Sequence, residues 1–554
     1  RENKMSNLLQ KASIITTPTA YDTGKILSVK PVQTYGPELV TNGDFATDTD
    51  WTKGTGWTIS GGKAISTSGG ASEIYQSGGI VGSKSYLFTY EITAYTSGSV
   101  VSRLFTGTTG TPRSAVGVYQ EVLYSVISNG NLGFITGAGG FNGSIDNVTV
   151  KEVFNADFDF SRNSSATRVG SNGLIQDVAS NLPRIDYTGG VGSWKFEPQR
   201  TNLFIASEDF STSWSQNNVL IDINQIISPN GTLDADLIKE SSTNNPHFIF
   251  QTVGATTTSE YTLSVFAKYY SRFLQVFFGG GDVSGNPYVN FDLQNGTFNN
   301  VGANSVSMEN YGNGWYKCTI IATSSVTSSF NPIFGLVETL GAARANSYQG
   351  DGTSGVYLWG AQLESGSYPT SYIRSNTGSA TTRLADVANN AGSSDLINST
   401  EGVLYAEISA LADDGTYKLI SLDNGSTSNT LFLGYSNNAN KIHGSIISGG
   451  VVQFVFDYLL GFDIKLNIKI ALKYKQNDFA LFLNGFKIIT DLSGDTPIGI
   501  NNLSYKLGNG SLPFYGNTKS VAVFKEALTD LELECLVSWM SFSDLGINFG
   551  YTVE

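Results

Sequence analysis

Short segments in which apolar and polar residues alternate recur along this chain, separated by turn-forming residues. Examples are SYLFTYEITAY from Ser85 and YTLSVFAKYY from Tyr261. A period of two places successive side chains on opposite faces of a β-strand, as a half-buried sheet requires. Strands at roughly ten-residue intervals, with Gly, Asn and Ser between them, are typical of β-sandwiches. The pattern therefore predicts an all-β protein.

Length and charge further limit the number of domains and the kinds of partner that are expected. With 554 residues the chain is too long for a single hydrophobic core, so several domains are expected. The net charge is −14, and the sequence has no cluster of Lys and Arg that would attract phosphate backbones or anionic lipid. No run of about 18 apolar residues occurs either. We therefore expect no nucleic-acid partner and no membrane insertion.

Two parts of the chain repeat the same order of features. An apolar segment is followed by an acidic residue and a Phe, then by a Trp: Asp44-Phe45 and Trp51 in the first part, Asp209-Phe210 and Trp214 in the second. Two copies of one sandwich explain this repetition better than a single large domain. The two Trp residues, which occupy the same place in both copies, are expected to be structural.

The remaining segments complete the predicted organisation. We expect an N-terminal arm at 1–36, a first sandwich at 37–153, an irregular joint at 154–200, a second sandwich at 201–376, a polar linker at 377–399, a third sandwich at 400–545 and a C-terminal tail at 546–554. In the joint, Arg162, Arg168 and Arg184 can bridge carbonyls and carboxylates of different domains. The Thr529-x-x-Glu532 capping box predicts a helix over 529–540.

The joint also carries a resemblance to a known group of proteins. ATRVGSNGLIQDVASNLPRIDY, followed by EPQRTNLFIASEDFSTSW, resembles a joint of tailed-bacteriophage virion proteins. Units that end like YLWGAQLESGSYPTSYI, with ATTRLADV just after, recur in tail-fibre and head-fibre proteins of that group. The segment KASIITTPTAYDTGKILSVKP is similar to their leaders. The resemblance implies a virion-surface protein whose N-terminal arm docks on another capsid, tail or fibre subunit; a frayed terminus is the alternative.

The sandwiches resemble sugar-binding modules. The first, which opens with LVTNGDF and closes with IDNVTVKEV, is similar to jelly-roll carbohydrate-binding modules, and the second is a looser member of that class. The third is similar to concanavalin A-like, laminin-G-type lectin domains through IALKYKQNDFALFLNG and VAVFKEALTDLEL. The resemblance implies two jelly rolls and one concanavalin A-like sandwich, adhesion to host or environmental glycans, and a homo-oligomer, either a dimer or a trimer.

Exposed aromatic rings are the candidate sugar contacts, because the C–H face of a pyranose packs on a ring. The candidates are Trp57 and Tyr75 in the first jelly roll and Tyr269 and Tyr270 in the second. Aromatic residues at alternate strand positions also fill cores, which is the competing interpretation. Tyr269 and Tyr270 are adjacent, so on a strand one of them must point outward.

A structural calcium is the other feature that the jelly-roll resemblance implies. Carboxylates near the meeting point of the first and last strands are its candidate ligands. These are Asp44 and Asp146 in the first jelly roll, and Asp209 and Glu364 in the second. The alternative is that they cap turns by accepting backbone N–H groups. No other cofactor is required.

The sequence offers little material for catalysis. The only histidines, His247 and His443, and the two cysteines, Cys318 and Cys535, lie far apart, without the spacing of a zinc site or a Ser/His/Asp triad. We therefore expect a protein that is not an enzyme. The alternatives are capsid decoration without a ligand, a polysaccharide-degrading enzyme and a secreted cell-surface adhesin. Because residues 1–22 lack the apolar core of a secretion signal, we expect synthesis in the host cytoplasm.

Overall fold

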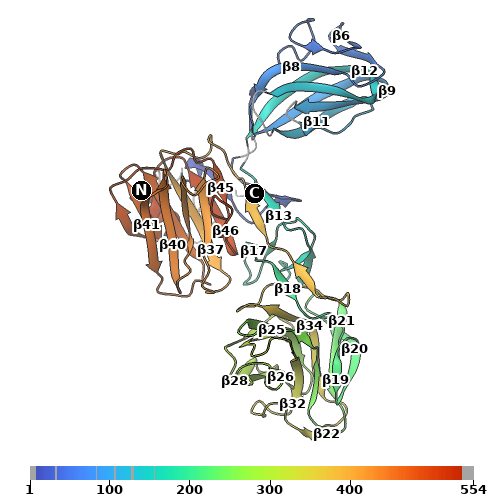
Figure 1. Cartoon of the computed structure of the whole chain (residues 1–554), viewed down its shortest axis with the longest axis vertical. Coiled ribbons are helices and arrows are strands. Elements are labelled where there is room, and N and C mark those ends of the chain that lie inside the picture. Colours follow the sequence, from blue (N-terminus) through green and yellow to red (C-terminus); the bar gives the residue numbers. More distant parts are fainter. Residues whose placement is uncertain are drawn as a thin grey trace. The chain divides into compact units, whose positions relative to one another are not determined.

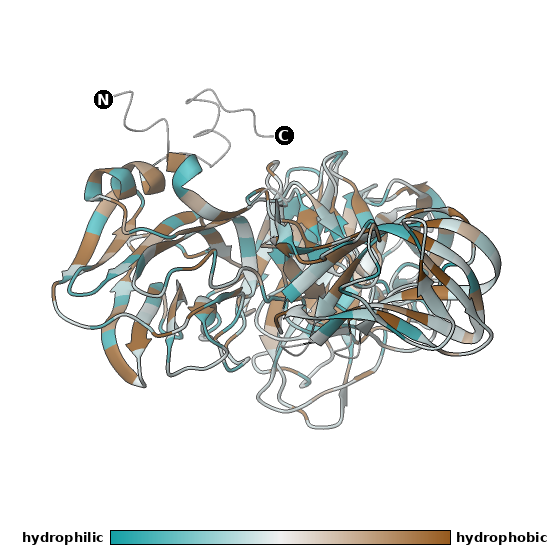
Figure 2. Cartoon of the chain, turned by 90° about the horizontal axis from the view of Figure 1, so that it is seen from above, coloured by the Kyte–Doolittle hydropathy of each residue, from teal (hydrophilic) through white to brown (hydrophobic). Residues whose placement is uncertain are grey.

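The computed structural model describes residues 8–31, 34–82, 84–104, 108–125, 130–154 and 156–538. Nearly all of its regular structure is β-strand, arranged as tandem β-sandwiches, so the predicted fold class is confirmed (Figure 1). Lys30–Asn155 forms one compact unit, and the other described residues form a second, larger one. Apolar and polar residues alternate along many strands (Figure 2). None of the helices in the described ranges has the length and apolar character needed to cross a membrane.

The smaller unit, Lys30–Asn155, is built around two long strands. Its strands are β4 (Thr34–Glu38), β5 (Thr52–Lys53), β6 (Trp57–Ile59), β7 (Ala64–Ser68), β8 (Glu73–Ile80), β9 (Lys84–Leu104), β10 (Thr108–Thr109), β11 (Gly117–Ser125) and β12 (Gly130–Phe154). Strands β9 and β12 pair antiparallel along most of their length, with several register shifts. The other strands add to this pair and enclose a core rich in aromatic side chains, including Trp57, Phe88, Tyr90 and Phe134.

The first sandwich of the larger unit has two six-stranded sheets. One contains, in order, β19 (Ser215–Asn217), β23 (His247–Phe250), β32 (Pro332–Val337), β26 (Phe273–Phe278), β27 (Tyr288–Asp292) and β28 (Thr297–Val301). The other contains β20 (Val219–Ile227), β21 (Leu233–Glu240), β34 (Gly355–Ser365), β25 (Glu260–Tyr269), β30 (Trp315–Thr323) and β29 (Ser305–Asn310). We call this the middle sandwich. Its core lies between the two sheets.

The repeated Phe and Trp occupy equivalent places in both units. The ring centroids of Phe45 and Trp51 lie 5.1 Å apart, and those of Phe210 and Trp214 also lie 5.1 Å apart. Each indole N–H donates to a carbonyl eight or nine residues earlier, that of Asn42 for Trp51 and that of Ala206 for Trp214. Both Trp side chains are buried. Their predicted structural role is confirmed.

The second sandwich of the larger unit pairs an eight-stranded with a five-stranded sheet, and we call it the C-terminal sandwich. The larger sheet contains β16 (Ile185–Asp186), β17 (Ser193–Phe196), β46 (Gly516–Phe524), β37 (Glu401–Ala410), β42 (Ile468–Lys475), β43 (Phe479–Leu483) and β44 (Phe486–Asp491), with β1 (Ala12–Thr16) beside β46. The smaller sheet contains β41 (Val451–Leu459), β40 (Lys441–Ser448), β39 (Thr430–Tyr435), β38 (Lys418–Asp423) and β45 (Asn502–Ser504).

The N-terminal segment is part of this sandwich rather than a free arm. Strand β1 pairs antiparallel with β46, from Ala12 opposite Phe524 to Thr16 opposite Val521. Ile14 lies in the core between the sheets, and Ile15 packs in a second cluster on the other face of the sheet. These two neighbouring apolar residues point to opposite faces of the sheet, so both faces of the strand are buried. The docking of residues 1–36 on another subunit stays a prediction.

The joint and the predicted linker also contribute strands. β13 (Phe158–Ser161) joins β2 (Tyr21–Asp22), β3 (Lys25–Ile26) and β36 (Val387–Asn389) in a four-stranded sheet; β14 (Ala166–Val169) pairs with β15 (Ile175–Val178), and β18 (Arg200–Asn202) with β35 (Thr381–Arg383). The points where the chain leaves for the smaller unit and returns are hydrogen-bonded. The Ser28 N–H donates to the Asp157 carboxylate at 2.8 Å, and the Ala156 N–H donates to the Ser28 hydroxyl at 3.3 Å.

Two short helices pack outside the eight-stranded sheet: α2 (Leu8–Lys11) and α3 (Asp530–Ser538). The predicted capping box of α3 is confirmed, since the Thr529 N–H donates to the Glu532 carboxylate at 2.9 Å. Leu533, Leu536 and Val537 form its buried face. The predicted last residues, 539 and 540, lie outside the described ranges.

Candidate functional site

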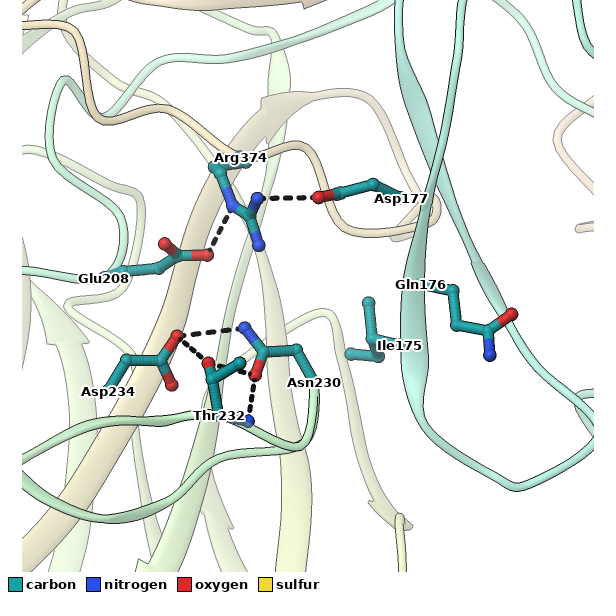
Figure 3. A pocket seen from close by; sticks show the side chains of 8 residues that line it. All are labelled: Ile175, Gln176, Asp177, Glu208, Asn230, Thr232, Asp234 and Arg374. Atoms are coloured by element: carbon teal, nitrogen blue, oxygen red, sulfur yellow. Dashed lines mark hydrogen bonds and ion pairs between the residues drawn. The ribbon is translucent and has the colours of Figure 1, made fainter.

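A polar pocket of about 500 Å³ lies where the joint meets the middle sandwich (Figure 3). Four parts of the chain line it: strand β15, the segment that precedes the middle sandwich, the β20–β21 turn, and the segment that follows the middle sandwich. The lining residues are Ile175, Gln176, Asp177, Glu208, Asn230, Thr232, Asp234 and Arg374. Seven of the eight carry side chains that can donate or accept hydrogen bonds, while Ile175 supplies an apolar surface.

Arg374 spans one side of this pocket. Its Nη1 donates to Asp177 at 2.7 Å, and its Nε donates to Glu208 at 2.9 Å. Burial alone would lower the pKa of Arg374, but hydrogen bonding to Glu208 and attraction to both carboxylates raise it. Glu208 also accepts the Tyr372 hydroxyl at 2.9 Å. The guanidinium is therefore permanently charged and held in one orientation.

The β20–β21 turn forms the opposite side. The Asp234 carboxylate accepts the Asn230 amide at 2.9 Å and the Thr232 hydroxyl at 2.6 Å. The Asn230 side chain in turn accepts the Thr232 N–H at 2.7 Å. Gly231 between them has a φ of 88°, a conformation that favours glycine. The sequence Asn-Gly-Thr thus fixes the polar side chains of this wall before any ligand arrives.

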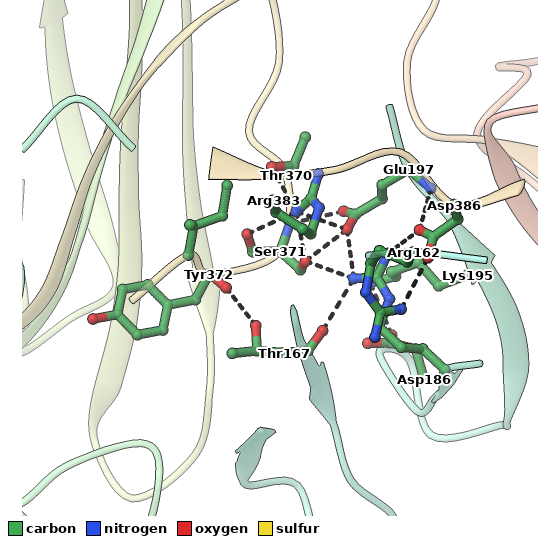
Figure 4. Close-up of polar contacts among 12 residues, drawn as sticks. Arg162, Thr167, Asp186, Lys195, Glu197, Thr370, Ser371, Tyr372, Arg383 and Asp386 are labelled. Carbon is green, nitrogen blue, oxygen red and sulfur yellow. Dashed lines mark hydrogen bonds and ion pairs between the residues drawn. The ribbon is translucent and has the colours of Figure 1, made fainter. Parts of the chain in front are cut away.

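A buried ion network holds the segment that carries Arg374 (Figure 4). Arg162 donates to Asp386 at 3.0 Å, while Arg184 donates to Asp386 and, at 2.6 Å, to Glu197. Arg383 lies 3.0 Å from Glu197. All of these side chains are buried. Arg162 and Arg184 were predicted to bridge different domains; their carboxylate partners instead lie in the predicted linker (Asp386) and in the joint itself (Glu197). Arg168 contacts Gln176 and Tyr21.

The network and the pocket are connected through the backbone after Thr370. Glu197 accepts the Ser371 N–H at 2.7 Å, and the Thr167 hydroxyl donates to the Tyr372 carbonyl at 2.6 Å. Arg374 follows two residues later. The polar joint, which was predicted to be irregular, therefore positions one wall of the pocket. The predicted linker takes part as well, since it supplies Arg383 and Asp386.

The charge of Glu197 depends on this network. Burial would raise its pKa, but attraction to Arg383, Arg184 and Lys195 holds the pKa well below its usual value of 4.5. A carboxylate with a lowered folded-state pKa stabilises the fold above that usual value, and the stabilisation disappears as the pH falls toward the folded-state pKa.

We expect the Glu197→Gln variant to be less stable than the unchanged chain, most of all above about pH 5, with the difference shrinking toward pH 3. Urea unfolding of the larger unit at several pH values measures this difference. A difference that stays constant over that range would show that Glu197 does not need its charge.

The structure places the predicted sugar-contacting rings differently in the two units. Tyr269 and Tyr270, at the end of β25, are 36% and 46% exposed, and Tyr270 packs edge-on against Tyr357 with centroids 5.4 Å apart. Tyr75 is half-buried on β8. The structure corrects the prediction that Trp57 contacts sugar. Its side chain is only 4% exposed because β6 turns it into the core against Phe141, so its ring is not available to a ligand.

The four predicted calcium ligands are engaged in local hydrogen bonds. Asp44 accepts the Ala46 N–H at 3.3 Å, and Asp146 accepts the Asn147 N–H at 2.7 Å. Asp209 accepts the Ser211 N–H at 2.8 Å, and the buried Glu364 accepts the Thr370 N–H at 3.0 Å. Across the described ranges, no three His, Cys, Asp or Glu side chains gather closely enough to share a metal ion. Calcium binding stays a prediction.

None of the residues that line the pocket in Figure 3 was predicted from the sequence. Asp177, Asn230 and Arg374 lie up to about two hundred residues apart, so no local pattern joins them. The one usable signal was the turn sequence SPNGTLD from Ser228, which concentrates polar side chains at a glycine turn.

Comparisons with known proteins find similarity only among solved structures. No protein-family model and no curated protein matches the chain. The carbohydrate-binding module CBM40 of the Ruminococcus gnavus IT-sialidase, bound to α2,3-sialyllactose, is 18% identical; the match covers 27% of this chain and 93% of that one, with a TM-score of 0.23. A leech intramolecular trans-sialidase is 19% identical over 26% of this chain and 24% of its own, with a TM-score of 0.22. Similarity at this level does not identify a ligand for this chain.

Proposed function

We propose that this chain is a glycan-binding adhesin on the surface of a tailed-bacteriophage virion, without catalytic activity, and that the pocket beside Arg374 is one of its sugar sites. The observation that supports a binding site is the pocket itself: hydrogen-bonding side chains from four parts of the chain converge in a pocket of about 500 Å³. Binding sites use a few fixed polar groups in this way to orient a ligand. The virion context is supported by the resemblance of the joint.

The charges of the pocket favour one class of sugar. Asp177, Glu208 and Asp234 are acidic, and Arg374 is the single basic residue among the lining side chains. An excess of negative charge repels carboxylate-bearing sugars such as sialic or uronic acids. Carboxylates accept hydrogen bonds from hydroxyl and ammonium groups. We therefore propose that neutral or amine-bearing sugars are the ligands.

A glycan array with the full chain tests the proposal. We expect binding to neutral or amine-bearing bacterial polysaccharides. The affinity of each single site should be weak, and several sites that bind one polysaccharide together should raise the overall affinity. The double variant Asp177→Ala/Thr232→Ala should weaken binding at least tenfold, because it removes two hydrogen-bonding groups that contribute about 1 kcal/mol each. Titration calorimetry with an array-positive oligosaccharide measures the loss.

A second surface depression supplies a matched control. It measures about 510 Å³ and is lined by residues of the C-terminal sandwich, including Asp495 and Thr496. The Asp495→Ala/Thr496→Ala variant makes the same chemical change there and should leave binding unchanged. Loss of binding in this variant instead would move the site to the C-terminal sandwich. No binding to any glycan would favour capsid decoration, and release of oligosaccharides would favour an enzyme.

A further inference from the structure

Strand β41 is an open edge of the C-terminal sandwich. Among the described strands it pairs only with β40, and Figure 1 shows it at the outer end of the five-stranded sheet, away from β17 and the joint. The strand runs for nine residues, Val451–Leu459. Its outward backbone N–H and C=O groups are therefore available to a further strand.

The side chains of this strand are unusually apolar for an exposed edge. Val451, Val452, Val455 and Leu459 are all more than half exposed. Edge strands in soluble proteins are normally protected by charged residues, proline or bulges. The only charged residue of β41 is Asp457, and its carboxylate is neutralised by Lys441 at 2.8 Å. A bulge interrupts the pairing with β40 near Gln453, which leaves the run from Phe454 to Leu459 regular.

Other edges of the molecule are better protected. In the same sheet, the opposite edge strand β45 is covered, because Leu503 exchanges backbone hydrogen bonds with Ala391. In the smaller unit, β11 also exposes valines, but the Thr108 hydroxyl donates to the Tyr124 carbonyl at 2.7 Å and the Thr111 N–H donates to Glu121 at 2.8 Å. On β41 comparable cover lies near Gln453, where the Asp495 N–H donates to the Gln453 side chain at 3.0 Å. Among the described strands, the part from Val455 to Leu459 pairs with β40 alone.

A second copy of the same strand fits this edge. In an antiparallel pair with a twofold axis at Val455, this residue faces its own counterpart, and Asp457 faces Gln453 of the second copy. No two carboxylates are opposed, and each Asp457 already has its own Lys441. Contacts of this kind are self-complementary and close on themselves as a dimer. They also cover part of the exposed valine surface.

We propose that two copies of this chain form a dimer by antiparallel pairing of their β41 strands about Val455, which joins two five-stranded sheets into one of ten strands. The proposal does not depend on glycan binding. It selects the dimer from the two predicted oligomers, a dimer and a trimer.

Sedimentation velocity of the full chain over a range of micromolar concentrations tests the proposal. We expect a dimer for the unchanged protein, and at least a tenfold weaker dimer for Val455→Lys, because the change places two like charges at the axis. Val455 is exposed, so the variant should keep its fold, which thermal unfolding verifies. The matched control is Val122→Lys on β11, also an exposed valine, which should dimerise normally.

A covalent test gives a positive signal. In antiparallel sheets, directly opposed residues can lie within the Cα separation that a disulfide spans. The Val455→Cys variant should therefore form a disulfide-linked dimer under mild oxidation, and Val122→Cys should not. A monomer or trimer for the unchanged protein, a stable dimer for Val455→Lys, or a lost dimer for Val122→Lys would each overturn the proposal.

Discussion

Replacing Asp386 by alanine should lower the free energy of unfolding of the larger unit by about 3–5 kcal/mol. The change leaves Arg162 and Arg184 buried without this carboxylate, and the Glu197 N–H also loses its acceptor at 2.9 Å. An uncompensated buried charge costs far more than an exposed ion pair contributes. Calorimetry of the full chain should show the transition of the larger unit at a lower temperature.

Two controls accompany this experiment. The smaller unit, Lys30–Asn155, contains no part of the network, so its transition should not move. The Asp159→Ala variant removes an exposed ion pair with Lys25 from the same joint and should cost less than about 0.5 kcal/mol. Equal costs for the Asp386 and Asp159 variants would show that the buried network does not hold the larger unit together.

Replacing Trp359 by alanine should have an effect of similar size, again about 3–5 kcal/mol on the larger unit. Trp359 is fully buried on the face of the middle sandwich that the joint covers. Its ring centroid lies 4.8 Å from that of Tyr372 and 5.4 Å from that of Phe266. The variant leaves a large cavity between sheet and joint. Because Tyr372 precedes Arg374 by two residues, glycan affinity should fall as well.

Trp57 offers the matched comparison, since it fills the core of the smaller unit. Trp57→Ala should lower only the transition of that unit and leave the larger unit unchanged. Thermal unfolding of both variants measures the two transitions in one experiment. If Trp359→Ala left the larger unit as stable as before, the joint would not be packed on the middle sandwich in solution.

The parts of the fold that depend on local sequence can be predicted from it. Asn484-Gly485 has positive φ at both residues, 45° and 92°, as a two-residue hairpin turn requires, and it joins β43 to β44. The Thr529–Glu532 capping box starts α3 where expected. These features depend on residues a few positions apart, so a local pattern is sufficient.

Features that depend on distant pairing could not be predicted. Strand β17 joins β46 more than three hundred residues later, with Trp194 opposite Thr518, and no turn or period in either segment specifies that partner. The burial of Trp57 depends in the same way on which face β7 and β12 cover. The pocket beside Arg374 exists only after four separate segments have met, so its residues carried no common signal in the sequence.

The hydrogen bonds between Ser28, Ala156 and Asp157 have a consequence for how such chains diversify. At this point hydrogen bonds hold together the two places where the chain of the larger unit is interrupted. The 126 residues of Lys30–Asn155 are therefore an insertion between two neighbouring positions of that unit. Lengthening an insertion costs little additional loop-closure entropy. Recombination can therefore exchange one inserted module for another while the body of the protein keeps its fold, and new surface specificities can arise in a single genetic event.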